Sequence, residues 1–237
     1  MGLPKIDQPL FELTVPSTEK KINFRPFTVK EEKILLIARE SNEMTQVVLA
    51  IKQIINNCCP DLDVDTLAVF DLEYLMLQLR AKSVNNEIKF TITDPDTEEQ
   101  VELVVDVDDI QITRNPDHSK KVELNDQYFM MMRYPSINEL SNLQGLGGEE
   151  PAESILFNTM ISCIETLVDE STDEVYNFNE FSQEEIEEFV SQFTSSAVKQ
   201  LQEFFATAPK MKYSAPYKDS TGKDKTFNME GLDTFFT

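Results

Sequence analysis

The stretch Phe24-Arg25-Pro26-Phe27-Thr28-Val29-Lys30-Glu31 marks the place where a short aromatic strand ends and the first helix begins. Thr28 and Glu31 have capping-box spacing, in which each side chain bonds to a backbone N–H group at a helix start. Apolar side chains then recur at helical spacing as far as Ile55. We therefore predict one unusually long helix over residues 28–55, with the N-terminal half of the chain packed on it.

Segments that alternate apolar and polar residues predict three β-hairpins. The first hairpin precedes the long helix, the second follows a helix that Asp65 or Asp71 can cap and that ends at Ala81, and the third lies near the C-terminus. The paired segments are Leu10–Val15 with Lys21–Phe24, Ile88–Ile92 with Val101–Val105, and Met211–Tyr213 with Thr226–Met229.

The second half of the chain is predicted to contain several helices, with short strands at Ile110–Ile112, Lys121–Leu124 and Val175–Phe178. Ser182 and Glu185 repeat the capping-box spacing and locate one helix start. The glycine-rich run 145–151 is the clearest break in the pattern, and we place a hinge there. The expected helices cover 125–134, a short segment from Ser136, 155–168, a segment from Ser182, and 198–205.

Together these segments predict an α+β fold that is mainly helical, with two lobes that each place antiparallel β-hairpins beside helices. We assign residues 1–145 to an N-terminal lobe, 146–151 to the hinge and 152–237 to a C-terminal lobe. Residues 75–103 and 201–229 share the order of a helix followed by a hairpin, which is a weak internal echo.

The charge of the chain excludes several classes of function. Lys and Arg number 21 against 43 Asp and Glu, which gives a formal net charge of −22. Such a surface repels phosphate backbones and anionic lipid headgroups, so we expect neither a nucleic acid nor a membrane as partner. Apolar runs are too short to span a bilayer, and we expect a soluble protein. Cys58, Cys59 and Cys163 form no disulfide framework, which is typical of a reducing cytoplasm.

Chemically suggestive residues have simpler structural explanations, and we predict no catalytic, cofactor-binding or metal-binding residue. His118 is the only histidine, and we interpret it as a solvated loop residue. Asp61–Asp65 resembles the start of a calcium loop but lacks its glycine and its final glutamate, so helix capping explains it better. Asp94 lies in a charged hairpin turn that protects the sheet tip. Met130–Met132 is interpreted as core filler on a helix, with an adaptable partner surface as the alternative.

Four blocks of the sequence, taken in order, resemble the baseplate hub assembly proteins of contractile-tailed bacteriophages of the T-even type. The resemblance extends from Leu3 to Phe236 and lies in the order and spacing of the blocks rather than in any catalytic signature. The blocks are the Phe24–Phe27 element with its helix, Asp71–Leu75 leading to Leu79–Val84, Phe181–Glu185 through Phe189, and Phe204–Phe205 followed by Ala208–Lys210 and Gly231–Phe236.

The resemblance implies a protein without enzymatic activity that assembles the central hub of a tail baseplate. On this interpretation it is an assembly factor or chaperone that binds hub or tape-measure subunits in the host cytoplasm. The alternatives are a structural hub subunit retained in the virion, in the tail baseplate, and a hydrolase that acts during hub assembly. The oligomeric state stays open.

Four phenylalanines are the candidate partner-binding residues: Phe24 and Phe27 near the N-terminus, and Phe235 and Phe236 at the C-terminus. Aromatic side chains contribute strongly to protein interfaces, but they are also buried freely in cores. A docking patch and ordinary core packing are therefore both consistent with the sequence.

Overall fold

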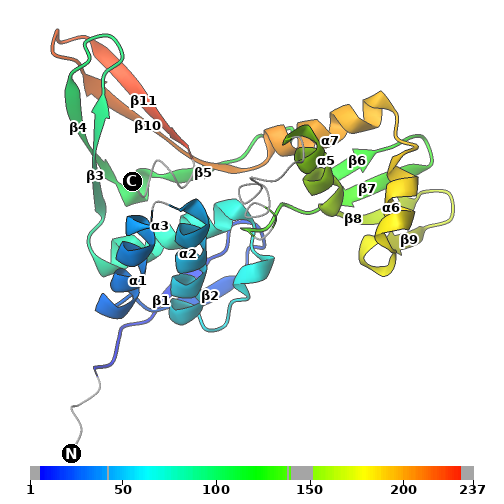
Figure 1. Cartoon of the computed structure of the whole chain (residues 1–237), viewed down its shortest axis with the longest axis horizontal. Coiled ribbons are helices and arrows are strands. Elements are labelled where there is room, and N and C mark those ends of the chain that lie inside the picture. The colour runs from blue at the N-terminus through cyan, green and yellow to red at the C-terminus, as the bar shows by residue number, and fades with distance from the viewer. Residues whose placement is uncertain (1–5, 42, 138, 140–151, 231–237) are drawn as a thin grey trace, which may run out of the picture. The chain divides into compact units, whose positions relative to one another are not determined.

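The computed structural model describes residues 6–41, 43–137, 139 and 152–230. The chain divides into two compact units. Unit 1 comprises Met1–Thr113 together with Lys210–Thr237, and unit 2 comprises Arg114–Pro209. Unit 2 is therefore an insertion between two segments of unit 1, and both units are drawn in Figure 1.

The N-terminal part of unit 1 combines one hairpin with three helices (Figure 1). Strands β1 (Phe11–Thr14) and β2 (Lys21–Phe24) pair antiparallel, as predicted. They lead into α1 (Val29–Glu40), α2 (Met44–Cys58), the short 3₁₀ helix η1 (Val64–Thr66) and α3 (Val69–Ser83). Thr28 donates its backbone N–H to Glu31 Oε2 at 2.9 Å, so the predicted start of the first helix is confirmed.

The prediction of one long helix over residues 28–55 is wrong, because α1 ends at Glu40 and α2 begins at Met44. Ser41 provides a physical reason for the break. Its Oγ donates to the carbonyl of Ala38 at 2.6 Å and accepts from the N–H of Glu43 at 3.2 Å. These local bonds offer the backbone an alternative to continued helical bonding.

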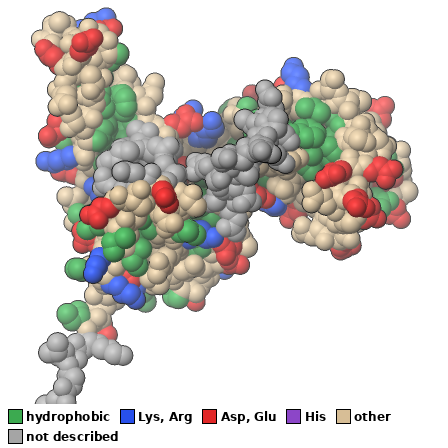
Figure 2. Space-filling view, viewed as in Figure 1, with side chains coloured by type: hydrophobic (Ala, Val, Ile, Leu, Met, Phe, Trp, Pro, Cys, Tyr) green, Lys and Arg blue, Asp and Glu red, His purple; other side chains and the backbone are tan. Residues whose placement is uncertain are grey.

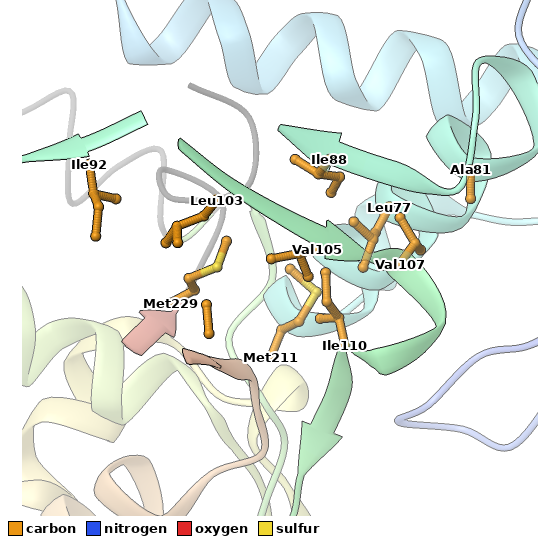
Figure 3. Packing of buried hydrophobic residues seen from close by; sticks show 11 residues of the cluster. Leu77, Ala81, Ile88, Ile92, Leu103, Val105, Val107, Ile110, Met211 and Met229 are labelled. Carbon is orange, nitrogen blue, oxygen red and sulfur yellow. The ribbon is translucent and has the colours of Figure 1, made fainter. Parts of the chain in front are cut away.

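Unit 1 is completed by two hairpins, both predicted from the sequence. Strands β3 (Glu87–Thr93) and β4 (Gln100–Asp106) form one, and η2 (Val107–Asp109) then leads to β5 (Gln111–Thr113). Strands β10 (Lys210–Lys218) and β11 (Asp224–Glu230) form the other, and β10 also pairs with β5, which gives the strand order β11-β10-β5. Figure 3 shows the shared core, in which Leu77 of α3, Val105 of β4 and Met211 of β10 are each almost fully buried.

Unit 2 is built on a four-stranded antiparallel sheet in the order β6-β7-β8-β9. Its strands are β6 (Lys121–Glu123), β7 (Tyr128–Met132), β8 (Ile164–Asp169) and β9 (Glu174–Asn177), and its other elements are α5 (Ala152–Ser162), η3 (Phe178–Glu180), α6 (Gln183–Val190) and α7 (Ser195–Thr207). The helix start predicted at Ser182 is confirmed, since Ser182 and Glu185 form both bonds of a capping box.

Two helix predictions in this unit are wrong. Residues 128–132 form β7, in which Met130 and Met132 are buried while Phe129 and Met131 are half-buried, so burial alternates as in a strand. The predicted helix 155–168 stops at Ser162, and Ile164–Asp169 forms β8. The β-branched residues Ile164, Thr166 and Val168 favour a strand there. The interpretation of Met130 as core filler is confirmed, although it lies on a strand.

The fold class is therefore mixed α+β, and the expectation of a mainly helical protein is wrong. Helices account for 39% and strands for 30% of the structure, and the described residues contain six helices and four small antiparallel sheets. The two compact units follow boundaries other than the predicted lobes 1–145 and 152–237, because the C-terminal hairpin pairs with β5. The predicted hinge at 146–151 lies outside the described residues and stays a prediction.

The same local arrangement occurs once in each unit. Directly after β2, Arg25 donates a side-chain bond to Glu31 at 3.0 Å and its backbone N–H to the carbonyl of Cys58 at 3.0 Å. Directly after β7, Arg133 donates to Glu139 at 3.0 Å and its backbone N–H to the carbonyl of Cys163 at 2.8 Å. In both cases the glutamate also accepts the backbone N–H of a residue three positions earlier, Thr28 or Ser136.

This repetition extends the weak echo noted in the sequence. In both units a strand leads through an arginine and a proline to a backbone N–H that bonds to a glutamate three positions later, and a buried cysteine closes the arrangement. The α3 helix is followed by the β3–β4 hairpin, just as α7 is followed by β10–β11. Glu31 is almost fully buried, and although burial alone would raise its pKa, the bonds from Arg25 and Thr28 lower it to about 2.

Candidate protein-binding surface

The four candidate phenylalanines do not form one surface in the described structure. Phe24 is only 2% exposed, and its ring packs against that of Phe11 with 5.7 Å between centroids. Phe27 is half-buried, and its backbone N–H donates to Ser83 Oγ at 2.9 Å. The burial of Phe24 favours the packing alternative for this residue. Phe235 and Phe236 lie outside the described residues, so a docking role for them stays a prediction.

His118 is not the solvated loop residue that we expected. It is half-buried in unit 2, with Nδ1 2.9 Å from Thr207 Oγ1 and Nε2 3.0 Å from the hydroxyl of Tyr134. Thr207 donates its own hydrogen to the carbonyl of Glu203 at 2.7 Å, so it accepts from His118. The bond to Thr207 therefore places a proton on Nδ1. Burial, together with the nearby ammonium of Lys120, lowers the pKa of His118 below its usual value of 6.5.

Asp94 lies on the predicted charged turn, between β3 and β4, but it is not exposed there. Its side chain is fully buried and accepts bonds from Lys225 Nζ at 2.7 Å and from the Tyr217 hydroxyl at 2.7 Å. Asp219, on the turn of the neighbouring hairpin, lies 3.2 Å from the same ammonium. The other carboxylates of this turn, including Asp96, are exposed as a charged turn predicts, whereas the partners of Asp94 come from β10 and β11, far along the chain.

The Asp61–Asp65 segment behaves as the capping interpretation predicts. Asp63 caps the short helix η1 by accepting the N–H of Asp65 at 3.2 Å. Within the part of the chain that the structure describes, no group of three or more His, Cys, Asp or Glu side chains is arranged to hold a metal ion. That the folded protein holds no stoichiometric metal stays a prediction, which elemental analysis after dialysis would test.

Unit 2 carries an apolar groove of about 450 Å³ between the sheet and α6. We call it the α6 groove. Tyr128 of β7 and Leu167 of β8 form its floor, and Ile186 and Phe189 of α6 form one wall. Tyr176, Phe178 and Phe181 complete the lining. Phe181 is 40% exposed, which is unusual for a large aromatic side chain.

The local sequence explains why the α6 groove exists. Phe178–Glu180 forms a single 3₁₀ turn, after which the Ser182 capping box starts α6 immediately. This short connection holds Phe178 buried at the base and leaves Phe181 exposed at the edge. Phe178 and Phe189 meet edge to face at 6.0 Å, as do Phe189 and Phe193 at 5.4 Å, so the aromatic wall is fixed by packing.

A second hollow of about 480 Å³ adjoins the α6 groove and shares Phe178, Phe181 and Ile186 with it. Arg133 and Ile161 lie on its far side. Above the buried Phe178, the side chains of Phe181 and Ile186 therefore form a ridge with an open space on each side. A partner that covers Phe181 would contact both hollows.

The segment that supplies most of the lining of the α6 groove is acidic. Residues 134–198 contain no Lys, Arg or His, although they include all of α6 and β9. Figure 2 shows Asp and Glu side chains gathered over this part of unit 2. Lys121 with Glu170, at 2.7 Å, is the ion pair that segment 164–192 forms among the described residues. The groove is therefore an apolar surface in a negative field.

Unit 1 carries another apolar hollow, of about 470 Å³, between α1 and α2. Ile37 and Leu49 line it and are 58% and 52% exposed. Its surroundings are of mixed charge, since Lys33 and Lys52 lie on the same two helices as Glu32 and Glu40. It therefore lacks the uniform field of the α6 groove.

Sequence reasoning located the Phe181–Phe189 block but did not single it out as a binding surface. The signal was the absence of basic residues from 134 to 198 combined with Phe181, Ile186 and Phe189 at short intervals. The exposed position of Phe181 depends on how the 3₁₀ turn meets α6. The spacing of apolar residues in the sequence does not reveal this geometry.

These features define a mixed α+β protein with acidic, partly apolar surfaces. Its described residues include no helix that is both long and apolar enough to cross a bilayer. The chain matches, over residues 8–237, the family model described as T4 bacteriophage base plate protein. It therefore belongs to that family and is a phage baseplate protein. The comparison with curated proteins and the comparison with solved structures gave no match.

Proposed function

We propose that this baseplate protein is a non-enzymatic assembly factor that binds hub or tape-measure subunits while the central hub of the tail is built in the host cytoplasm. The observation that carries the proposal is the match to the baseplate family along almost the whole chain, combined with the acidic α6 groove. A binding protein of this kind acts through surfaces and requires no reactive group.

The chemistry of the nucleophilic residues supports a role without catalysis. Burial raises the pKa of Cys58 to about 11 and the pKa of Cys59 and of Cys163 to about 12, so these thiols stay protonated and poorly reactive. His118 has both ring nitrogens in hydrogen bonds to Thr207 and Tyr134 and cannot serve as a free base. The three cysteines and His118 therefore give the hydrolase alternative no support.

A structural hub subunit retained in the virion is the second candidate. The two candidates differ in whether the protein leaves the finished particle. Tagged protein would be captured from infected cells, and its partners identified by mass spectrometry, beside a quantitative count of this chain in tail intermediates and in purified virions. We expect hub or tape-measure subunits among the partners and loss of the chain from mature virions.

A stoichiometric amount of the chain in mature virions would favour the structural subunit instead. Capture that yields no tail protein at all would overturn both versions. Loss of tail assembly in a correctly folded His118 variant that still binds its partners would favour the hydrolase.

A further inference from the structure

We infer that the α6 groove binds a basic amphipathic segment of a partner polypeptide, in which a large apolar side chain is flanked by Lys or Arg. The inference rests on the proposed function and deepens it, because it names the surface and the chemistry of the partner. One observation supports it most strongly. The apolar groove is lined mainly by residues of segment 134–198, and none of the 65 residues of this segment is basic.

The apolar part of the binding surface is already formed in the structure without a partner. Phe181 stands 40% exposed on the ridge, and Ile186 and Phe189 beside it are only half-buried. A partner side chain that covers this ridge removes aromatic surface from water on both molecules. The walls are already fixed by the edge-to-face contacts of Phe178, Phe189 and Phe193, so little conformational freedom is lost on binding.

The electrostatic contribution favours a partner segment that carries positive charge. Segment 164–192 carries ten carboxylates, and the ion pair that it forms among the described residues belongs to Glu170. Cationic side chains that flank the apolar anchor would meet this field, whereas an acidic segment would be repelled. The ten residues are Glu165, Asp169, Glu170, Asp173, Glu174, Glu180, Glu184, Glu185, Glu187 and Glu188.

The electrostatic and the apolar contributions affect different rate constants of binding. At physiological salt the field is screened beyond about 8 Å, so charge mainly speeds and orients the encounter. The apolar anchor sets the rate of dissociation. A second copy of this chain is a poorer occupant than a basic segment, because like charge would oppose its approach at a net charge of −22.

The probe is a synthetic amphipathic peptide of Leu, Phe and Lys, titrated into the full-length chain with methyl groups labelled for NMR. The matched control peptide carries Glu in place of every Lys. We expect the Lys peptide to shift the methyl signals of Leu167 and Ile186, and the Glu peptide to leave them unchanged. Leu49, in the unit 1 hollow, provides a reference methyl that should not move.

Two variants test the two contributions. Phe181→Ala should weaken binding of the Lys peptide by about tenfold, mainly through faster dissociation. Its control is Leu49→Ala, which removes a similarly exposed apolar side chain from unit 1 and should leave the affinity unchanged. Because Phe181 is well exposed, its variant should fold normally, which the NMR spectrum reports directly.

The charge variant is Glu184→Gln with Glu188→Gln, both exposed on α6. At low salt it should slow association by about threefold, and the difference should vanish at high salt. Glu32→Gln with Glu102→Gln changes the net charge equally from exposed positions in unit 1 and should have a much smaller effect.

Equal binding of the Lys and Glu peptides, or an unchanged affinity after Phe181→Ala, would overturn the inference. If hub subunits are captured normally by the Phe181→Ala and charge variants, the groove is not their site although the proposed function stands. Self-association through the groove, seen as dimers that Phe181→Ala dissolves, would replace the partner segment with a second copy and would also refute the inference.

Discussion

Lys225 places its ammonium 2.7 Å from the carboxylate of Asp94, although the two residues are 131 positions apart in the chain. Asp94 is fully buried on the turn of the β3–β4 hairpin, and Lys225 lies near the start of β11. The pair joins the turn of the β3–β4 hairpin to β11, which belongs to a different sheet of the described structure. This one cation therefore neutralises a buried carboxylate that would otherwise oppose folding.

Lys225→Met should lower the melting temperature by several degrees, because it leaves the buried Asp94 without its cation. The matched control is Lys218→Met, which removes an exposed lysine of β10 that pairs with exposed Asp224 and should change the melting temperature little. Thermal unfolding followed by circular dichroism makes the comparison. A Lys225 variant as stable as the control would mean that Asp94 is held by its turn and by Tyr217 alone.

Acid should destabilise the fold over a defined range of pH. The pKa of Glu31 and that of Asp219 are each lowered to about 2, and bonds from Lys225 and Tyr217 hold the pKa of Asp94 well below its usual range. Groups with a lowered folded pKa stabilise the native state above their unfolded pKa of about 4. That contribution is lost as the pH falls from about 4 toward 2.

Urea unfolding at a series of pH values between 7 and 2 measures this loss. Lys225→Met should flatten part of the dependence, since Asp94 then has a higher folded pKa. A free energy of unfolding that stays constant between pH 4 and 2 would contradict the assignment of these carboxylates.

His118 should titrate below its usual pKa of 6.5, and it can be observed without overlap because it is the only histidine. A lowered folded pKa means that the unfolded chain binds the proton first, so stability should fall as the pH drops below about 6.5. The imidazole proton signal measures the pKa directly. A midpoint at or above 6.5 would show that burial and the ammonium of Lys120 do not favour the neutral ring.

The variant His118→Phe keeps an aromatic ring between Tyr134 and Phe204, which lie 5.6 Å and 5.1 Å from the imidazole by centroid. It removes two hydrogen bonds, at a cost of about 1–2 kcal/mol of stability. It should also abolish the pH dependence of stability near pH 6.5, because His118 is the only histidine in the chain.

The C-terminal phenylalanines provide a separate test of partner binding. Phe235→Ala with Phe236→Ala should weaken capture of the hub partner mainly through faster dissociation, if this pair is an apolar anchor. If the pair packs in a core instead, the double variant should lower the melting temperature by several degrees. Thermal unfolding and binding kinetics, measured on the same preparation, distinguish the two results.

Local signals in the sequence predicted much of the fold. The capping boxes at Thr28 and Ser182 located two helix starts, and alternation located three hairpins, because both patterns depend on neighbours a few residues away. Met130 and Ile164 were assigned to helices because short apolar runs fit either period. Their burial in β7 and β8 depends on pairing between strands that the sequence places more than thirty residues apart.

The functional surfaces were harder to predict for the same reason. Asp94 was placed on a charged turn, but its ion pair was not predicted because Lys225 is distant in the chain. His118 looked exposed because Thr207 and Tyr134 come from other elements. The Arg25–Glu31 and Arg133–Glu139 arrangements shared a visible spacing of arginine, Thr or Ser, and glutamate, yet only the bonds to the carbonyls of Cys58 and Cys163 relate them as one structural motif.

The chain enters unit 2 after Thr113 and returns at Lys210, and these two residues are direct partners in the antiparallel β5–β10 pair. The ends of the inserted unit are therefore separated by about the spacing of adjacent strands, roughly 4.8 Å. A two-residue turn such as Asn-Gly can join those strands as an ordinary hairpin. The part of the molecule that carries the α6 groove is thus exchangeable: another domain whose termini lie close together can be grafted onto the same two strands while the remaining scaffold keeps its own core.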